Sequence, residues 1–255
     1  MSRCFDADTQ ALREREKVNA AGAVYNLEDW IIEQVRPSAG MRVLDLGCGT
    51  GKQIFAFAKQ VSPEGSLVGL DISKEAVEAV NERARCENLR HITAVRGSLD
   101  DALDILKAQR FDLIISSYAF YYATNMRQLL IGLRALLSAH GQVFVCGPGQ
   151  GTNQEMIELM NKLLPSQSKL VPPIGDFIGD ADLVAIRPGY SRVTTVCLQN
   201  QIRFLSPEPL LQWWRNHNSY IPEINEAMTR TVHSYFDGHQ AFLLSKNVLG
   251  VHCHA

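Results

Sequence analysis

The sequence predicts an α/β fold in which a mostly parallel sheet is covered by helices on both faces. Short apolar runs alternate with amphipathic stretches from about residue 41 onward, which is typical of parallel strands joined by crossover helices. Hydrophobic residues make up 46% of the 255 positions and charged residues 20%, so the chain can bury a large core. We therefore expect one large domain.

The first half of the chain supplies most of the expected sheet. A helical pattern rich in Ala, Glu, Arg and Leu runs from about 11 to 35, and Ser38-Ala39-Gly40 is a turn signal. The expected strands are 41–46, 66–70, 91–95, 111–116 and 142–146. The expected helices are about 52–60, 74–86, 101–108 and 126–138. Ser73 precedes the second of these helices and can cap it.

The second half, after Gly151, has a different pattern. Asn153 can cap the first helix expected there, and a loop rich in Pro and Gly follows that helix. The elements expected are a helix at about 154–164, an extended stretch at 192–205, helical material at about 207–235 and a last strand at 241–251. We interpret this half as a continuation of the same sheet with a helical insertion, so that 1–255 forms a single domain.

Charge and composition argue against several classes of partner. The formal net charge is −2 and no basic run is sustained, so no nucleic-acid surface is expected. No stretch of 18 apolar residues could span a bilayer, and the start MSRCFDADTQ lacks a signal pattern, so we expect a cytoplasmic protein without a membrane partner. The six cysteines show no CxxC pairing, and alternation along a strand separates the side chains of His252-Cys253-His254. No metal site is expected, and the oligomeric state stays open.

The stretch VLDLGCGTGK, residues 43–52, places three glycines between the first strand and its helix. Such a loop points backbone N–H groups and a helix N-terminus at the carboxyl edge of the sheet, where ligands of α/β folds bind. A phosphate-binding P-loop needs GxxxxGK[ST], but Gln53 follows Lys52 here. A dinucleotide loop needs GxGxxG, and here the third glycine comes one residue early.

Two acidic residues decide among the ligands that such a loop can hold. Asp71 ends the second strand and is placed to accept hydrogen bonds from ribose hydroxyls. Asp45 ends the first strand, where its carboxylate repels a pyrophosphate and suits a cationic ammonium. A ligand with adenine, ribose and an amino-acid ammonium is S-adenosylmethionine, which we expect as the cofactor.

At these motifs the chain resembles the class I S-adenosylmethionine-dependent methyltransferases, closest to the small-molecule branch of the ubiquinone/menaquinone-biosynthesis type. The stretches that match are VLDLGCGTG, VGLDIS, FDLIISSYAFYY and GQVFVCGP, and they cover roughly residues 25–150. The resemblance implies a Rossmann-like, seven-stranded, mostly parallel sheet whose last strand is antiparallel. It also implies a helical cap at 1–40, a cofactor-binding core at 41–150, and the remaining sheet with a helical lid at 151–255, the lid lying at about 207–235.

The resemblance assigns roles to the residues at the strand ends. For the amino-acid end of the cofactor, it implies contacts from Asp45, Gly47, Cys48, Gly49 and Gly51 at the methionine moiety, and from Ser116 and Ser117 at the amino-acid end and methyl group. For the nucleoside, it implies Asp71 at the ribose, Ile72 on one adenine face, and Ser98, Leu99 and Asp100 at the adenine edge. It also implies a cofactor contact from Tyr25 on the cap. Many relatives carry Asp where Ser98 stands. Asp100 or the N–H of Leu99 is therefore the alternative adenine contact.

The acceptor side is less explicit. Tyr118, Tyr121 and Tyr122 lie where the acceptor pocket of this family begins, although aromatic residues there can also simply cover the sheet edge. On the expected lid helix, Trp213 and Trp214 point about 100° apart, so only one of them is expected to be fully buried, and the other can roof a pocket. His217 follows Trp213 by four residues and shares its helix face. These lid residues and the three tyrosines are the expected substrate contacts, and His217 and Tyr118 are the candidate catalytic residues.

The sequence therefore predicts methyl transfer from S-adenosylmethionine to a small-molecule acceptor at O or N, leaving S-adenosylhomocysteine. The N/DPPY motif is absent after the fourth strand, which disfavours methylation of amino groups of bases or glutamine by that route. Two alternatives stay open: transfer of the 3-amino-3-carboxypropyl group from the same cofactor, and a non-catalytic module that binds the cofactor and a partner. The glycine motif does not separate them.

Overall fold

The computed structural model describes residues 22–62, 64–170, 176–217 and 219–255. It divides the chain into two compact units, each formed by segments that are distant in sequence. Among the described residues, the large unit comprises 27–62, 64–148, 176–197 and 249–255, and the small unit comprises 22–26, 149–170, 198–217 and 219–248. Within the described residues, no helix combines the length and apolar character that crossing a bilayer requires.

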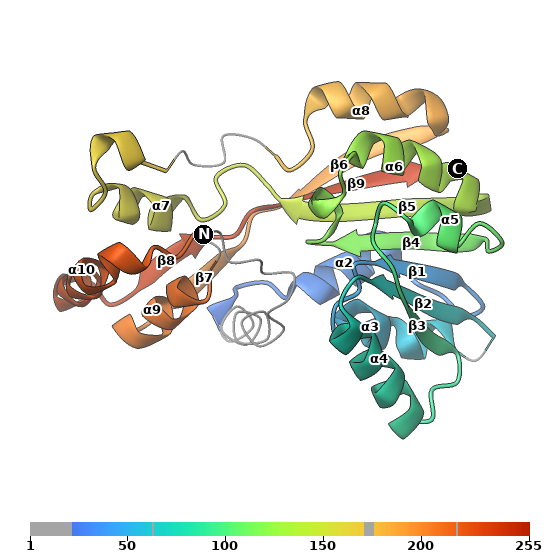
Figure 1. Ribbon diagram of the computed structural model, residues 1–255, viewed down its shortest axis with the longest axis horizontal. Helices are drawn as coiled ribbons and strands as arrows, with labels where there is room; N and C mark the ends of the chain where they lie inside the picture. Colours follow the sequence, from blue (N-terminus) through green and yellow to red (C-terminus); the bar gives the residue numbers. More distant parts are fainter. Residues whose placement is uncertain (1–21, 63, 171–175, 218) are drawn as a thin grey trace. The chain divides into compact units, whose positions relative to one another are not determined.

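The large unit is built on a seven-stranded sheet of order β3-β2-β1-β4-β5-β9-β6. Its strands are β1 (Arg42–Leu46), β2 (Ser66–Asp71), β3 (Ile92–Arg96), β4 (Phe111–Ser117), β5 (Leu137–Pro148), β6 (Arg192–Leu198) and β9 (Val248–His254). The pairs β1–β2, β1–β4, β2–β3 and β4–β5 are parallel. The last strand, β9, lies beside β5 and runs antiparallel to it (Figure 1). The mostly parallel sheet with an antiparallel last strand is therefore confirmed.

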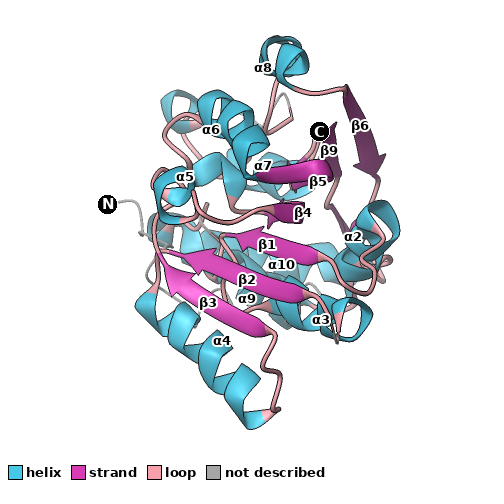
Figure 2. Ribbon diagram, turned by 90° about the vertical axis from the view of Figure 1, so that its right-hand side faces the viewer, coloured by secondary structure: helices cyan, strands magenta, loops and turns pink. Residues whose placement is uncertain are grey.

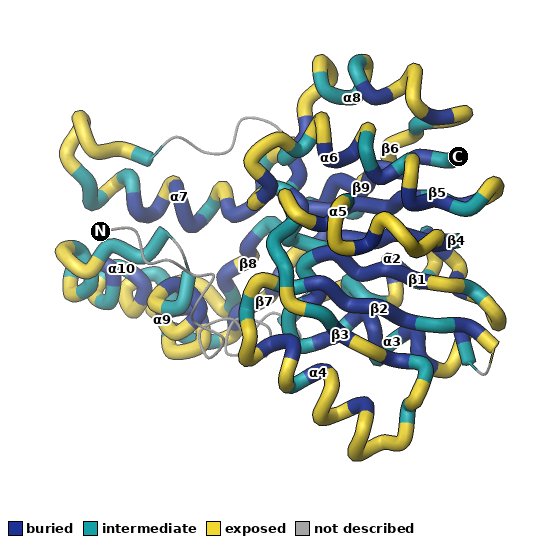
Figure 3. Tube along the Cα trace, turned by 45° about the vertical axis from the view of Figure 1, so that its right-hand side comes forward, coloured by how far each residue is buried: buried dark blue, intermediate teal, exposed yellow. Residues whose placement is uncertain are grey.

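Helices lie on both sides of this sheet (Figure 2). They are α2 (Leu27–Val35), α3 (Lys52–Val61), α4 (Lys74–Cys86), α5 (Ala102–Ile105), α6 (Met126–Leu133) and α8 (Asp180–Ile186), with the 3₁₀ turns η2 (Phe120–Tyr122), η3 (Arg134–Leu136) and η5 (Arg187–Gly189). The central strands are buried along nearly their whole length, whereas the outer side of α4 is exposed (Figure 3). Strands covered on both faces need continuous apolar runs, which explains why 43–46 and 113–116 contain so few polar residues.

The small unit packs helices on a two-stranded antiparallel sheet, β7 (Gln201–Phe204) with β8 (Phe242–Ser245). Its helices are α7 (Gln154–Asn161), α9 (Pro207–Arg215) and α10 (Asn225–Gly238), with the 3₁₀ turns η4 (Ser166–Ser168) and η6 (Pro222–Ile224). Alternate residues of β7, Ile202 and Phe204, are buried and join Leu210 and Met228 in one apolar cluster. The period-two burial is that of a sheet with one covered face.

Most expected elements of the first half are confirmed. The helix expected at 74–86 is α4, and the Ser73 hydroxyl caps it by accepting the Ala76 N–H at 3.2 Å. Of the helical pattern expected at 11–35, α2 covers Leu27–Val35, and 11–21 lie outside the described residues. The helix expected at 126–138 is shorter, because α6 and η3 end at Leu136 and β5 begins directly afterwards.

The extended stretch predicted at 192–205 is found as two strands, and the prediction of one last strand at 241–251 is wrong. The stretch 192–205 divides into β6 and β7, and 241–251 divides into β8 and β9, so that each stretch contributes to both sheets. Asn200 marks the first division: its buried side chain accepts the N–H groups of Tyr25 and Gln201 and donates to the Tyr25 carbonyl. A side chain that satisfies backbone groups in this way replaces strand pairing at that point.

Asn153 does not cap α7 with its side chain, contrary to the sequence prediction. Its backbone is left-handed, with φ of 58°, and its Oδ1 accepts a hydrogen bond from Lys246 Nζ at 3.2 Å. The helix α8 was not predicted.

Candidate functional site

The glycine loop joins β1 to α3 through three left-handed glycines. The φ angles of Gly47, Gly49 and Gly51 are 73°, 50° and 82°, a region that residues with a Cβ rarely adopt. The N–H groups of Gly47 and Cys48 donate to the Leu70 carbonyl at 2.7 and 3.1 Å, which fixes the loop to the end of β2. A Cβ on Gly47 would lie 2.2 Å from the Ala119 Cβ, so the segment after β4 touches the loop where no side chain fits.

Helix α3 begins immediately after this loop. It has no side-chain cap and no acidic residue in its first turn. The partial positive charge of its N-terminus therefore points toward the loop, and no side chain at the cap position accepts hydrogen bonds from its first N–H groups. Lys52, its first residue, is paired with Glu28 of α2 at 2.7 Å.

Asp71 ties the glycine loop to the end of β2. Its Oδ2 accepts the Gly49 N–H at 2.7 Å, and its Oδ1 accepts the Ser73 N–H at 2.9 Å. A carboxylate offers about four lone-pair positions, so two backbone donors leave capacity for hydroxyl groups of a ligand. Binding of the ribose by Asp71 stays a prediction.

Asp45 is the most unusual group of the site. Its side chain is 2% exposed, and its Oδ2 has no hydrogen-bond partner among the residues that the structure describes. Burial, and then the nearby Asp71 carboxylate, raise the pKa of Asp45 to about 8. Without a ligand, the carboxyl group is therefore mostly protonated at neutral pH, because an unpaired buried charge is unfavourable.

The raised pKa of Asp45 predicts that Asp45→Asn stabilises the chain in the absence of ligand. The folded-state pKa lies above the unfolded one, so wild-type stability falls as pH rises from about 4 to 8. The stability of the Asn variant does not fall in this way, because its side chain cannot ionise. We therefore expect it to be more stable than the wild type by about 1–3 kcal/mol at pH 8 and by much less at pH 5. Urea unfolding at the two pH values measures the difference.

Asp112 lies at the opposite edge of the sheet, and it serves as a control because its pKa is shifted in the opposite direction. Burial opposes its ionisation, but bonds from Arg42 and Ser138 outweigh burial and hold the pKa of Asp112 below its ordinary range. Asp112→Asn is therefore expected to destabilise the chain at neutral pH. A stabilising effect of Asp112→Asn, or an Asp45→Asn effect that shrinks with rising pH, would contradict this electrostatic account.

The residues predicted at the adenine lie beyond β2 and β3. Ile72 is 56% exposed, which leaves an apolar surface beside Asp71. Asp100 accepts the N–H and hydroxyl of Thr124 at 2.9 and 2.7 Å, so the structure gives both of its oxygens protein partners. The Ser98 hydroxyl donates to Asp101 at 2.7 Å, and the side chain of Leu99 packs against the apolar core. Ile72 and Asp100 are both exposed, and Ile72 is the one that offers apolar surface without a hydrogen-bonded side chain.

The residues that end β4 are held by the neighbouring strands. The Ser116 hydroxyl is buried and donates to the Leu46 carbonyl at 2.7 Å, while the Cys146 thiol donates to Ser117 at 3.6 Å. Tyr118 has a φ of 56°, an uncommon conformation for an aromatic residue. Burial raises the pKa of Tyr118, so its hydroxyl is neutral at physiological pH and is a hydrogen-bond donor rather than a base.

An aromatic group lies beyond β4 and β5. The ring centroids of Tyr121 and Tyr122 are 4.7 Å apart, and Phe177 lies edge-on to Tyr121 at 6.4 Å. Sequence reasoning missed Phe177. The available signal was Gly147 at the end of the fifth strand, where a Cβ would lie 2.9 Å from the Phe177 ring. Tyr122 is 54% exposed, so this group presents apolar surface to a ligand or partner.

The predicted lid residues belong to the small unit. Trp213 and Trp214 are 1% and 0% exposed, so the expectation that only one of them can be buried is wrong. Helix α9 is covered on two faces: Trp213 packs edge-on to Phe204 of β7, and Trp214 packs edge-on to Tyr220. The exposed side chain of Tyr25 belongs to this unit too, and its contact with the cofactor stays a prediction.

His217 stacks on Trp213 and joins a chain of polar side chains in the small unit. Its ring is 4.6 Å from Trp213 and tilted by 23°. Asn153 Nδ2 lies 3.3 Å from His217 Nε2, and Asn153 Oδ1 accepts from Lys246. His217 Nδ1 accepts the Ser219 N–H at 3.2 Å and lies 2.7 Å from Ser219 Oγ, so both ring nitrogens have partners within the small unit. A base at Nε2 would first have to leave Asn153.

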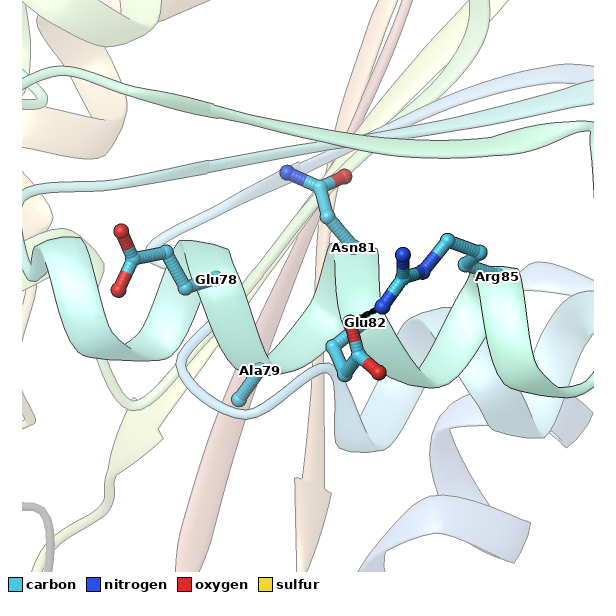
Figure 4. A pocket seen from close by; sticks show the side chains of 5 residues that line it. All are labelled: Glu78, Ala79, Asn81, Glu82 and Arg85. Atoms are coloured by element: carbon cyan, nitrogen blue, oxygen red, sulfur yellow. Dashed lines mark hydrogen bonds and ion pairs between the residues drawn. The ribbon is translucent and has the colours of Figure 1, made fainter.

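A surface hollow lies elsewhere, along α4 (Figure 4). Its lining is made by residues of one helix: Glu78, Ala79, Asn81, Glu82 and Arg85. Asn81 bonds to the N–H and carbonyl of Ala94, and Glu82 pairs with Arg85. These polar groups satisfy one another or the adjacent strand β3, so the hollow is not the candidate site.

Comparisons with known proteins agree with this geometry. A family model described as a methyltransferase domain matches residues 37–184. The chain is 29% identical to a demethylmenaquinone methyltransferase of Lactobacillus johnsonii over 143 residues, covering 54% of this chain and only 58% of that protein. It is 24% identical over 234 residues to a malonyl-[acyl-carrier protein] O-methyltransferase of Bacillus cereus, covering 86% and 84%. A solved structure of a SAM dependent methyltransferase from Aquifex aeolicus has a TM-score of 0.53 at 13% identity, covering 94% and 97%.

The family match extends over more than half of the chain and contains the glycine loop, Asp45 and Asp71. The solved structure, at 13% identity, agrees in fold alone. The chain therefore belongs to the family of methyltransferase domains.

Proposed function

We propose that this chain binds S-adenosyl-L-methionine and transfers its methyl group to a small-molecule acceptor at O or N, leaving S-adenosylhomocysteine. The observation that carries the proposal is the buried Asp45 carboxyl, whose Oδ2 lacks a partner among the described residues and lies in the field of Asp71. Two acidic side chains at one sheet edge disfavour a phosphate-rich ligand and favour a cation. The amino-acid ammonium of this cofactor supplies that cation.

The residues of the large unit fit the remaining parts of the cofactor. Asp71 retains lone pairs for the ribose hydroxyls, and the exposed Ile72 offers an apolar face for adenine. The uncapped N-terminus of α3 and the glycine loop suit the methionine carboxylate. When bound, the cofactor supplies an electrophilic methyl group on a positively charged sulfur. The protein's task is then to hold the acceptor in line with that methyl group and to exclude water.

The acceptor is proposed to carry apolar area. Tyr118, Tyr121, Tyr122 and Phe177 lie beyond β4 and β5, and Trp213, Trp214 and His217 are the predicted contacts from the small unit. The names of the two relatives, demethylmenaquinone and malonyl-[acyl-carrier protein] methyltransferase, support a small or carrier-bound organic acceptor. The neutral Tyr118 hydroxyl suits orienting such an acceptor rather than deprotonating it. We further propose that 1–255 acts as one methyltransferase domain in cytoplasmic small-molecule metabolism, without nucleic acid as substrate.

Product analysis tests the reaction class. The chain is incubated with a small-molecule cell extract and cofactor carrying a labelled methyl group, and nucleoside products and labelled metabolites are identified by mass spectrometry. We expect S-adenosylhomocysteine and one labelled metabolite, both reduced in Asp71→Ala at cofactor concentrations below saturation. Formation of 5′-methylthioadenosine would contradict methyl transfer in favour of aminocarboxypropyl transfer. Cofactor binding without turnover in extracts of several growth conditions would favour the non-catalytic module.

A further inference from the structure

The charge of the site raises a question that the proposed function leaves open. A ligand ammonium needs an ionised Asp45, but the carboxyl is 2% exposed and its Oδ2 has no hydrogen-bond partner among the described residues. Asp45 lies on β1 between Gly69 of β2 and Ile115 of β4, so its backbone cannot move away from the sheet. Among the residues that the structure describes, no cationic side chain bonds to that oxygen, so an ionised carboxylate there would be unbalanced without a ligand.

The groups around Asp45 cannot supply that balance. Asp71 at the end of β2 is itself acidic and is held in place by two backbone N–H groups. Cys48 on the loop and Cys146 on β5 lie in the field of Asp45, and burial raises the pKa of both thiols, that of Cys146 to about 12. Glu28 of α2 acts on the same Cys146 thiol and is paired with Lys52. Within the described part of the chain, the groups coupled to Asp45, namely Asp71, Cys48 and Cys146, are thus all acids.

We propose that binding of the cofactor's ammonium releases one proton from Asp45, so that the buried centre exchanges a proton for the ligand's positive charge. The inference rests on the proposed function, because it needs a ligand with an ammonium at this carboxyl. The O–H bond of the Asp45 carboxyl breaks, the proton passes to solvent, and the carboxylate oxygen accepts an N–H of the ammonium. The net charge of the buried centre stays the same, which makes the ionised form of Asp45 tolerable only in the complex.

The proposal has quantitative consequences for affinity. Since the pKa of Asp45 is about 8 without ligand, ~90% of the carboxyls carry a proton at pH 7, and roughly half do at pH 8. Only the ionised fraction binds tightly, so the apparent Kd falls about tenfold from pH 6 to 7 and about fivefold from pH 7 to 8. The site would then select against nucleosides without an amino-acid ammonium most strongly at pH 8.

The test is isothermal titration calorimetry with S-adenosylhomocysteine in buffers of different ionisation enthalpy, at pH 6, 7 and 8. The dependence of the observed heat on the buffer gives the number of protons released. We expect ~0.9 proton per ligand at pH 7 and about half a proton at pH 8, with the fall in Kd given above. The matched ligand is 5′-methylthioadenosine, which keeps adenine and ribose but lacks the ammonium and should release none.

Asp45→Asn is the matched variant. It keeps the shape of the side chain but has no proton to release, so its Kd for S-adenosylhomocysteine should be weaker and independent of pH. Equal affinity of variant and wild type for 5′-methylthioadenosine shows that the variant is folded. Tight wild-type binding without proton release, or the same release from Asp45→Asn, would overturn the inference while leaving the proposed function in place. No binding of S-adenosylhomocysteine at any pH would overturn the proposed function itself.

Discussion

Replacing Gly47 by alanine is expected to destabilise the chain by about 2–4 kcal/mol and to weaken cofactor binding roughly 100-fold. The new Cβ would lie 2.2 Å from the Ala119 Cβ, and the φ of 73° adds strain. Either Gly47 or the segment after β4 must move. Gly47 carries one of the two N–H groups that hold the loop on the Leu70 carbonyl, so a shift there displaces the loop as well.

Two companion variants separate the clash from the strain. Gly40→Ala has a similar φ of 83° but no atom within 4 Å of the new Cβ, so it should cost about 1 kcal/mol of stability and leave cofactor affinity unchanged. In the double variant Gly47→Ala/Ala119→Gly, the atom that clashes is gone, and most of the loss should be recovered. Denaturant unfolding and calorimetric titration measure both effects. A double variant no better than Gly47→Ala would show that the contact with Ala119 is not what requires glycine.

Asp71→Ala should weaken cofactor binding at least tenfold, which is about 1.4 kcal/mol or more. The variant removes the acceptor proposed for the ribose hydroxyls, and it also frees the Gly49 and Ser73 N–H groups. Calorimetric titration with S-adenosylhomocysteine measures the loss. Glu78→Ala is the control, because Glu78 is an exposed acidic residue on α4, paired only weakly with Lys74 at 3.6 Å.

A ligand analogue distinguishes a direct contact between Asp71 and the ribose from an indirect effect in which the variant loosens the glycine loop. If Asp71 contacts the ribose, a 2′,3′-dideoxy analogue of the cofactor should bind the wild type much more weakly than the natural nucleoside. The Asp71→Ala variant should hardly distinguish the two ligands. Equal discrimination by wild type and variant would mean that Asp71 acts only by holding the loop, and the ribose assignment would be wrong.

The first half of the chain could be predicted well because its signals are local. Each parallel strand of the first half is a short apolar run, and one of the helices that follow, α4, begins at a recognisable cap, Ser73. The glycine loop and the acidic residues at the ends of β1 and β2 follow from the same alternation, since carboxyl ends of parallel strands lie at one edge.

The parts that could not be predicted depend on contacts distant in sequence. The sequence shows 192–205 as one extended stretch and 241–251 as one strand, and only the pairing of β7 with β8 divides each of them between two sheets. The burial of both Trp213 and Trp214 depends on what covers the two faces of α9, which the helical period does not reveal. The coupling of Asp45 to Asp71 and its unpartnered oxygen likewise exist only in the folded chain.

The most direct test of the account is a crystal structure of the chain with S-adenosylhomocysteine bound. We expect the amino-acid ammonium within hydrogen-bond distance of Asp45 Oδ2, both ribose hydroxyls on the Asp71 carboxylate, and adenine against Ile72. A ligand that binds elsewhere, or an ammonium directed away from Asp45 towards solvent, would contradict the assignment of this sheet edge as the methyl-donor site.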